Sequence, residues 1–332
     1  MNPLVSVVIP CRNEEKTISL VLDALRQQTF PSEAMEVVIA DGLSTDGTRK
    51  AIHAFSEKHP QLTVRLVDNP QRVIPTGLNV AIKAAKGDLI VRMDAHSIPN
   101  ADYVERCVNA LNEGKAENVG GIWKISPRND SWQARSIAAA AANPFAVGDA
   151  HYRFTDIAGY VDTVPYGSYK RELFDRIGFF DEKLLANEDY ELNARILQDG
   201  GRIWLDPKIQ CTYFARPTFG ALAKQYWGYG YWKAQMLKRH PGTLRWRQAL
   251  PPLFVIGLLA LILIGFFWRP GWVVLAIVFA LYLLVQLIAA IRISLKDNQL
   301  MLSIGIVVTT LIMHLSWGSA FIVGLFSQPD RK

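Results

Sequence analysis

The chain has 332 residues, 50% of them hydrophobic, and a formal net charge of +6. Its length allows one large domain or two smaller ones. The positive charge does not indicate a nucleic-acid partner, because the sequence has no zinc-finger spacing, no basic helix with interleaved aromatic residues and no arginine-rich tract. Cys11, Cys107 and Cys211 are far apart and odd in number, which indicates neither a disulfide framework nor a metal cluster and is typical of a reducing compartment.

The first expected element is a short strand at residues 4–9, "LVSVVI", which "PCRNEE" ends. This apolar run is too short, and has the wrong flanking residues, for a signal peptide. Ile18, Val21, Leu22 and Leu25 then follow at the spacing of one helix face. The N-terminal region therefore begins with a strand and a helix.

Three further apolar runs alternate with helix-period segments. They are "MEVVIAD", which ends in Asp41, "LTVRLVD", and "DLIVRMD", which ends in Asp94. Strands that alternate with helices and read as continuous apolar runs predict an α/β fold with a parallel sheet covered on both faces. Ligands of such sheets bind at the carboxyl ends of the strands, so residues 11–14, Asp41 and Asp94 are expected to share one edge.

Each of these strand-end residues also has a plain structural interpretation. An Asp at the end of a strand is usually a turn or cap residue, and His96 is compatible with capping a turn. As ligands, however, Asp94 and His96 are two positions apart in "VRMDAHS" and can both reach one cation. A mixed oxygen and imidazole site suits Mn²⁺ better than Ca²⁺.

A second group of acids, Glu188 and Asp189, follows Asn187 in "NEDYEL". Asn187 followed by two acids is a good helix start, with an N-cap and carboxylates at the positive end of the helix dipole. The local pattern leaves open whether these carboxylates cap a helix, act in catalysis or do both.

Taken in order, five blocks of the chain resemble the family 2 glycosyltransferases with the GT-A nucleotide-sugar-binding fold. They are "SVVIPCRNEE", "VVIADGLSTDGT", "NPQRVIPTGLNVAIKAAKGDLIVRMDAHS", "PYGSYKRELFDRIGFFDE" and "NEDYELNARILQDGG". The likeness is greatest to membrane-anchored exopolysaccharide glucosyltransferases of the succinoglycan type and covers residues 4–245. It implies a Rossmann-like, mostly parallel GT-A sheet.

The resemblance also implies site residues. The nucleotide-sugar cradle would be made by Pro10, Arg12, Glu14, Asp41, Arg72, Asn79 and Asp94. Asp94 matches the first Asp of the family's Asp-x-Asp metal motif, and His96 replaces the second, as in the polypeptide N-acetylgalactosaminyltransferases that use this His as a ligand. A divalent cation, Mn²⁺ or Mg²⁺, would neutralise the leaving nucleoside diphosphate. The default donor is UDP-glucose.

The same resemblance assigns roles to the second group of acids. Asp189 matches the base of an inverting, single-displacement transfer, and Glu188 would position the acceptor or tune the pKa of the base. One departure bears on the product. Family 2 polymer synthases carry a Gln-x-x-Arg-Trp block, but here Gln225 is followed three residues later by Gly228. We therefore predict transfer of one sugar per encounter.

Nearly all the remaining apolar residues lie near the C-terminus. Uncharged runs at residues 251–267, 271–291 and 301–326 are separated by the short polar breaks "WRPG" and "RISLKDNQ". The last two exceed the roughly 18 uncharged residues that mark a membrane-spanning helix, and the first is within the lower bound. We predict about three transmembrane helices after a GT-A domain at residues 1–245. The alternative is a hydrophobic helical hairpin buried in a soluble protein.

The distribution of basic residues predicts the orientation. Five cations precede the first span without an intervening acid: Lys233, Lys238, Arg239, Arg245 and Arg247. The first loop between spans offers only Arg269, so the large N-terminal region should face the cytoplasm, at the inner membrane if the protein is bacterial. The cluster would also attract anionic membrane lipids. With three spans, Arg331 and Lys332 fall on the far side, against the rule.

This placement suggests the acceptor. A catalytic cleft at the cytoplasmic leaflet favours a lipid-linked saccharide over a soluble one. Two alternatives remain. A polyprenyl-phosphate sugar synthase would use a bare lipid phosphate and need more cationic groups near the cleft. A non-catalytic membrane scaffold is the alternative from another class, but the presence of Asp41, Asp94, Glu188 and Asp189 together argues against it.

Overall fold

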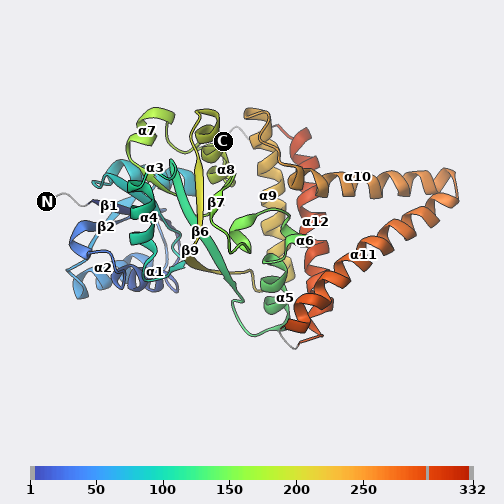
Figure 1. Ribbon diagram of the computed structural model, residues 1–332, viewed down its shortest axis with the longest axis horizontal. Helices are drawn as coiled ribbons and strands as arrows, with labels where there is room; N and C mark the ends of the chain where they lie inside the picture. Colours follow the sequence, from blue (N-terminus) through green and yellow to red (C-terminus); the bar gives the residue numbers. More distant parts are fainter. Residues whose placement is uncertain (1–3, 297–298, 329–332) are drawn as a thin grey trace. The chain divides into compact units, whose positions relative to one another are not determined.

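The computed structural model describes residues 4–296 and 299–328, which divide into two compact units. The sheet unit comprises Met1–Lys124 and His151–Tyr213, and the helical unit comprises Ile125–Ala150 and Phe214–Lys332. Figure 1 labels most of the elements of both. The predicted GT-A domain at residues 1–245 includes residues 125–150 and 214–245, which pack in the helical unit.

The sheet unit contains a nine-stranded mixed sheet in the order β3-β2-β1-β4-β8-β6-β9-β5, with β7 paired to β9. The strands are β1 Val5–Cys11, β2 Met35–Asp41, β3 Thr63–Asp68, β4 Leu89–Arg92, β5 Ile98–Pro99, β6 Asn118–Ser126, β7 Gly159–Tyr160, β8 Ser168–Lys170 and β9 Ile203–Phe214. The predicted strands β1 to β4 are all present and parallel. From β8 onward the described pairings are antiparallel, so only four of the nine strands form the parallel layer that the sequence predicts.

Helices surround this sheet and explain why its central parallel strands are buried and mostly apolar. They are α1 Ile18–Arg26, α2 Thr48–Lys58, α3 Ile74–Ala84, α4 Tyr103–Asn112, α7 Glu172–Ile177 and α8 Glu188–Gln198, with short 3₁₀ turns at Ser32–Ala34 and His151–Arg153. Every residue of β1 and β2 is buried. Because successive side chains of a strand point to opposite faces, both faces must be covered.

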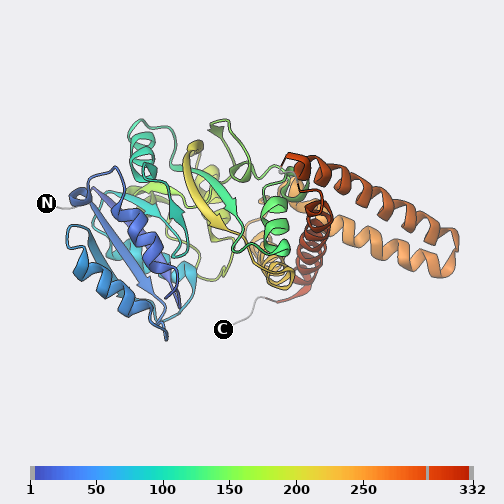
Figure 2. The ribbon, with the colours of Figure 1, turned by 90° about the horizontal axis from the view of Figure 1, so that it is seen from below.

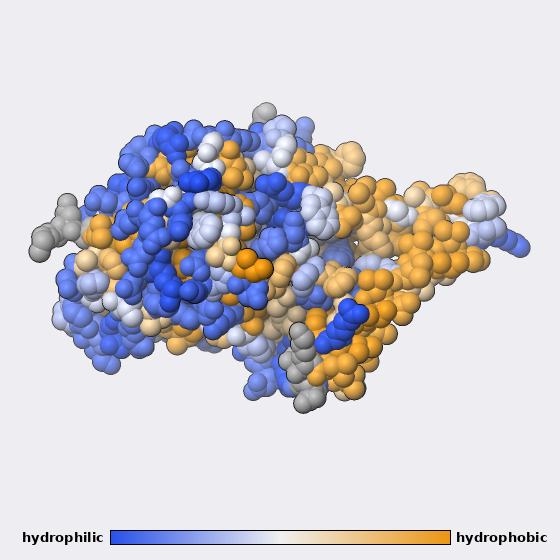
Figure 3. All heavy atoms as spheres, in the orientation of Figure 1, coloured by the Kyte–Doolittle hydropathy of each residue, from blue (hydrophilic) through white to orange (hydrophobic). Residues whose placement is uncertain are grey.

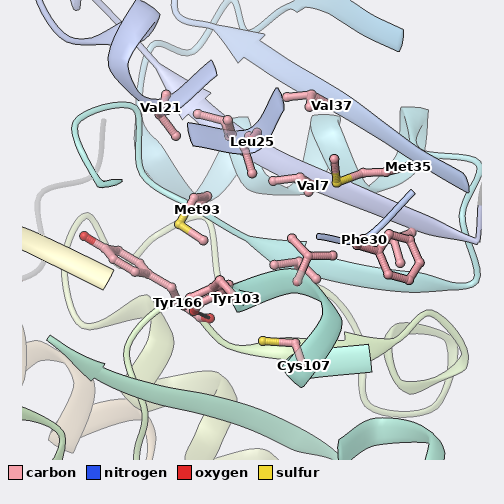
Figure 4. Packing of buried hydrophobic residues seen from close by; sticks show 14 of the residues in the cluster. Val7, Val21, Leu25, Phe30, Met35, Val37, Met93, Tyr103, Cys107 and Tyr166 are labelled. Carbon is pink, nitrogen blue, oxygen red and sulfur yellow. Dashed lines mark hydrogen bonds between the residues drawn. The ribbon is translucent and has the colours of Figure 1, made fainter. Parts of the chain in front are cut away.

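The main core lies on one face of this parallel layer. Val7, Val37 and Met93 pack there against Leu25 and Tyr103, as Figure 4 shows. Each fully buried aliphatic side chain contributes about 1.5–3 kcal/mol relative to an exposed one. This packing fixes the register in which β1 pairs with its neighbours, and therefore which residues stand at the strand ends.

In the described residues of the helical unit there are six helices: α5 Trp132–Ala141, α6 Pro144–Val147, α9 Phe219–Arg239, α10 Trp246–Phe267, α11 Pro270–Lys296 and α12 Leu302–Phe326. By length and composition, α10, α11 and α12 could each cross a membrane. Hydrophobic side chains cover most of the visible surface of α10 and α11 in Figure 3. These three helices correspond to the three predicted apolar spans.

Candidate functional site

A cavity of about 170 Å³ opens beside the carboxyl ends of β1 and β4 in the sheet unit. Six of the residues that the sequence analysis singles out line it: Pro10, Arg12, Glu14, Arg72, Asp94 and His96. Asn69 and the Val73–Ile74 pair complete the wall on the side of α3. The strand ends thus bring together two arginines and three groups that are able to hold a cation or a proton.

Local hydrogen bonds fix the loop that follows β1. Asn13 adopts a left-handed backbone, with φ 54°. Its backbone N–H donates to Ser44 Oγ at 2.8 Å, and its side-chain oxygen accepts from the Thr45 N–H at 2.9 Å. The Glu14 N–H donates to Thr48 Oγ1 at 2.8 Å. These hydrogen bonds join the loop after β1 to the loop after β2, and they thereby position Arg12 and Glu14.

Asp41, the last residue of β2, fixes the loop that follows this strand. Its side chain is buried and accepts hydrogen bonds from Ser44 Oγ at 2.5 Å and the Ser44 N–H at 3.1 Å. Arg49 donates to Asp41 at 3.2 Å and also pairs with Asp68 at 2.9 Å. Asp41 is paired with Cys11 at the end of β1, but it is not among the residues that line the cavity.

Asn79 also lies away from the cavity. Its amide nitrogen donates to the Phe180 carbonyl and to Glu182 Oε1, both at 2.9 Å, and its oxygen accepts from the Phe180 N–H at 3.0 Å. Both ends of the amide therefore hold the loop between α7 and α8. Here Asn79 positions the segment that leads to Glu188 rather than the wall of the cavity.

The carboxylates of the two predicted groups meet at a single cation, Arg92. Its guanidinium lies 3.3 Å from Asp94 Oδ1 and 3.0 Å from Glu188 Oε1, and it is also in contact with Asp189 Oδ2. The Arg92 side chain is only 5% exposed. A buried cation needs such partners, because an unpaired charge in the interior is strongly unfavourable.

Arg92 was not predicted as a site residue, although its place in an apolar strand indicates that anions lie nearby. It is the one charged residue in the run "LIVRM", and every residue of β4 is buried. An arginine in a fully buried strand requires anions nearby, which predicts a cluster of carboxylates at that point. The partners Glu188 and Asp189 are nearly a hundred positions away in the chain, so their identity could not be read from the sequence around Arg92.

Burial and charge set the protonation of this cluster. Burial raises the pKa of Glu188 to about 7, against the lowering effect of Arg92. Burial likewise raises the pKa of Asp189 above its usual value, again opposed by Arg92. Burial lowers the pKa of the Arg92 guanidinium, but the three carboxylates raise it to well above its usual value. Arg92 therefore stays charged, while Glu188 and Asp189 are poised to exchange protons.

The start of α8 differs from the capping interpretation of "NEDYEL". Asn187 stands at the N-cap position in a left-handed conformation, with φ 66°, and its side chain makes no capping hydrogen bond. Glu188 and Asp189 occupy the first turn and point to Arg92 instead. Within the described part of the chain, Asp189 Oδ1 is buried without a hydrogen-bond partner. A strained turn thus presents one carboxylate oxygen that is able to accept a proton.

The residues beside the cavity fit a divalent cation that is shared with a substrate. No group of three His, Cys, Asp or Glu among the residues described here could hold a metal by itself. Mg²⁺, however, is usually held by one or two carboxylates and by substrate phosphates. Asp94 and His96 supply such an incomplete set, with Glu14 at 3.3 Å from His96 Nδ1. The three carboxylates and one guanidinium at Arg92 also leave a formal charge of −2 when all four are ionised.

Comparisons with known proteins identify a matching family profile and several relatives. The sequence profile described as "Glycosyl transferase family 2" matches residues 6–178, which include Asp94 but end before Glu188. The chain is 32% identical over 262 residues to the succinoglycan biosynthesis protein ExoA of Rhizobium meliloti (strain 1021), covering 77% of this chain and 78% of the relative.

Two further relatives extend over nearly the whole chain. One is the dolichyl N-acetyl-alpha-D-glucosaminyl phosphate 3-beta-D-2,3-diacetamido-2,3-dideoxy-beta-D-glucuronosyltransferase of Methanococcus voltae, 26% identical over 327 residues and 97% of each chain. The other is the solved structure of a mannosyltransferase from Pyrobaculum calidifontis in complex with GDP-Man and Mn²⁺. It has a TM-score of 0.61 and 22% identity, and covers 94% of this chain and 87% of its own, so it supports the fold.

Proposed function

Since this chain belongs to glycosyl transferase family 2, we propose that it is a membrane-anchored, inverting enzyme that moves one sugar from a nucleotide sugar to a hydroxyl of a lipid-linked saccharide. UDP-glucose is the default donor. The observation that carries this proposal is the shared guanidinium of Arg92, which joins Asp94, beside the donor cavity, to Asp189, the candidate base. Arg92 would then link the carboxylate on the donor side, Asp94, to the carboxylate that deprotonates the acceptor, Asp189.

The donor diphosphate would occupy the cavity, where Arg12 and Arg72 supply positive charge. Asp94 and His96 would hold a divalent cation there, and such a cation neutralises the charge that develops on the leaving diphosphate. Arg72 has a left-handed backbone, with φ 62°, and strain of this kind is typical of ligand-binding positions. Asp41 and Asn79 would act indirectly, by fixing the loops on which these residues stand.

The acceptor hydroxyl would attack the anomeric carbon from the face opposite the diphosphate. As the new C–O bond forms, the bond from that carbon to the diphosphate oxygen breaks, and the hydroxyl proton passes to Asp189. One displacement of this kind inverts the anomeric configuration. Asp189 Oδ1 suits the role of base, because it is buried and has no partner among the described residues.

The acceptor class is proposed from the relatives and the apolar helices. The Methanococcus voltae relative, similar over 97% of the chain, is named for a dolichyl sugar phosphate, and the Rhizobium meliloti relative for succinoglycan biosynthesis. Three helices apolar enough to cross a membrane would hold the enzyme beside such lipid-linked acceptors. A chain that acts at a membrane gains access to lipid-linked substrates without extracting them from the bilayer.

The test is release of nucleoside diphosphate from a panel of nucleotide sugars, with Mn²⁺ or Mg²⁺ and a membrane lipid extract. We expect cation-dependent release from one donor, lost in Asp94→Ala and Asp189→Asn but kept in Asp88→Ala. Asp88 is the matched control, because it is an exposed carboxylate just before the same strand β4. No release from any donor by the folded protein would contradict the proposal.

Product analysis separates the acceptor alternatives. A radiolabelled sugar would be followed onto purified polyprenyl phosphate and onto a polyprenyl-diphosphate saccharide in parallel reactions. We expect label on the saccharide. Label on polyprenyl phosphate alone would make the chain a polyprenyl-phosphate sugar synthase, and equal transfer to a soluble oligosaccharide would remove the argument from the membrane helices.

A further inference from the structure

The last apolar helix, α12, is packed differently from the two before it. In its most apolar 18-residue window, 39% is buried, compared with 17% in α10 and in α11. Figures 1 and 2 show α10 and α11 as a hairpin that extends away from the rest of the helical unit, whereas α12 runs crosswise to that hairpin and alongside α9. The three helices therefore do not form one bundle of parallel spans.

Helix α12 follows α9 along its length. Leu222 and Met313 share one apolar cluster, and farther along a Cβ on Gly324 would lie 2.8 Å from the Cβ of Ala234. Between these points a Cβ on Gly230 would lie 2.1 Å from the backbone oxygen of Trp317 in α12, so the two backbones are in direct contact. The residue numbers of these contacting pairs increase together in both helices, so α9 and α12 run side by side in the same direction.

Both ends of α12 are bound to helices that precede the first span. At its start, the Trp132 indole of α5 donates to the Met301 carbonyl at 3.0 Å. At its end, Lys238 Nζ of α9 donates to the carbonyls of Gly324 at 2.8 Å and Ser327 at 2.6 Å. A helix of 25 residues is about 37 Å long, longer than the roughly 30 Å hydrocarbon core. If α12 crossed that core, one of these partners would have to cross with it.

The partner helix α9 is unsuited to the bilayer interior. It carries four cations: Lys224, Lys233, Lys238 and Arg239. Cations in the hydrocarbon core are strongly unfavourable. In addition, a Cβ on Gly318, in the middle of α12, would lie 2.5 Å from the Pro251 carbonyl near the start of α10. If α12 spanned the membrane, the first span would therefore begin at mid-bilayer.

We propose that only α10 and α11 cross the membrane and that α12 lies in the plane of the bilayer surface, on the side where α5 and α9 lie. Its partner is the lipid leaflet, into which the exposed side chains of Ile304, Val323 and Phe326 would insert to the depth of the headgroup and acyl boundary. The lysine that caps its last carbonyls then stays at the aqueous interface. This topology goes beyond the proposed reaction and does not depend on it.

Two spans also agree better than three with the positive-inside rule, which predicts on which side basic residues lie. Arg331 and Lys332 lie outside the described residues, but they follow α12 in the sequence. With three spans they fall opposite the basic cluster that precedes α10, against the positive-inside rule. With two spans, their position in the sequence agrees with that rule.

Cysteine labelling of the full chain in the membrane tests this topology. The native cysteines, Cys11, Cys107 and Cys211, are buried, so the parent chain is the blank. Single substitutions Arg128→Cys, Arg269→Cys and Gln328→Cys, all at exposed positions, would be treated with a membrane-impermeant maleimide in right-side-out and in inverted vesicles. We expect Gln328→Cys to label in the same vesicles as Arg128→Cys, and Arg269→Cys only in the opposite ones.

Two outcomes overturn the proposal. Labelling of Gln328→Cys from the face that labels Arg269→Cys would mean that α12 crosses the membrane. Labelling of Arg269→Cys from the face that labels Arg128→Cys would mean that the hairpin does not cross. If Gln328→Cys labels from neither face, a site for a sequence-specific protease inserted after Gln328 decides, because it is expected to be cut in the same vesicles as a site inserted after Asn129.

Discussion

At the scale of single residues, Arg92 determines how much negative charge the site can hold. Three carboxylates surround its buried guanidinium, and for two of them, Glu188 and Asp189, burial raises the pKa while Arg92 lowers it. Because Glu188 has a pKa of about 7, the carboxylate pair of Glu188 and Asp189 takes up a proton as the pH falls through that region. Because the pKa of Asp189 is also raised and the two acids titrate as a pair, part of this proton resides on the proposed base, so the rate of transfer should fall on the acid side.

Replacing Arg92 tests this role. In Arg92→Met the cation that lowers the pKa of Asp189 is gone, so the base stays protonated to higher pH and the acid limb of kcat should move to higher pH. In Arg92→Lys the charge remains, and the limb should stay close to that of the wild type. We expect kcat of Arg92→Met at pH 7 to fall by about 10²–10⁴-fold, the usual contribution of a positioned base.

The measurement is a kcat profile across pH for the three chains, with thermal unfolding as the check that each is folded. A purely structural role of Arg92 would lower the amount of folded protein without moving the acid limb. An unchanged limb in folded Arg92→Met would therefore contradict the assignment, and a similar shift in Arg92→Lys would show that geometry rather than charge matters.

The structure brings some of the predicted site residues to the cavity and leaves others outside its lining, and distance along the chain explains part of the difference. Asp94 and His96 follow directly from the end of β4, and both line the cavity. The hydrogen bonds of Asn79 instead reach residues more than 100 positions away, which no local pattern reveals. Asp41 was expected at the same edge and lies at the end of β2, but its short-range bonds to Ser44 turn it into the support of a loop.

At the scale of elements, the parallel strands were predictable and the shortest antiparallel ones were not. Strands β1 to β4 are continuous apolar runs with helices between them, which is the pattern of a covered parallel sheet. By contrast, β5, β7 and β8 have only two or three residues each. Segments this short show no period of two, so their strand character comes from pairing with β4 and β9.

One of these short strands, β8, pairs with β4, the strand that carries Arg92, and helps to fix its position. The Gly167 carbonyl, just before β8, accepts a hydrogen bond from the Arg92 N–H at 3.0 Å. A Cβ on Gly167 would lie 2.2 Å from Tyr169 Oη and 2.4 Å from Asn118 Oδ1. Tyr169 is 1% exposed and Asn118 is fully buried, so neither has room to move away. The glycine is therefore required for close approach.

We expect Gly167→Ala to destabilise the fold by about 1–3 kcal/mol, the usual cost of overpacking a core, and to lower kcat by displacing Arg92. Gly159→Ala is the matched control, since a Cβ there meets nothing within 4 Å and the change should leave stability nearly unaltered. Thermal unfolding and transfer rates of both variants check the prediction. Equal stability of the two variants would show that the contacts at Gly167 relax without strain.

At the scale of the whole molecule, composition predicted the apolar helices but not which segments pack with them. Three uncharged runs became α10, α11 and α12. Helix α9 and the segment with α5 and α6 belong to the same compact unit, although their mixed sequences resemble those of ordinary soluble helices. A Cβ on Gly305 of α12 would meet Ser136 Oγ of α5 at 2.0 Å, so small residues decide this packing. Such contacts between distant segments leave no periodic signal.

The arrangement of the helical unit predicts a product with one added sugar. A polymer exporter needs helices that enclose a channel, with much of their surface turned inward. In α10 and α11 only 17% of the most apolar window is buried. Gln225, which begins the broken Gln-x-x-Arg-Trp pattern, donates instead to Tyr229 Oη within α9 at 3.0 Å. Neither the helices nor this residue provides a path that would retain a growing chain.

The purified full chain, supplied with a lipid-linked saccharide and a large excess of donor, should therefore yield a single product one sugar longer than the acceptor. Mass spectrometry of the products over time distinguishes this from stepwise extension, with Asp189→Asn as the reaction without chemistry. A ladder of longer products would contradict the prediction. It would mean that the acceptor cleft readmits its own product, because among the described residues the exposed α10–α11 hairpin encloses no channel that could hold a polymer.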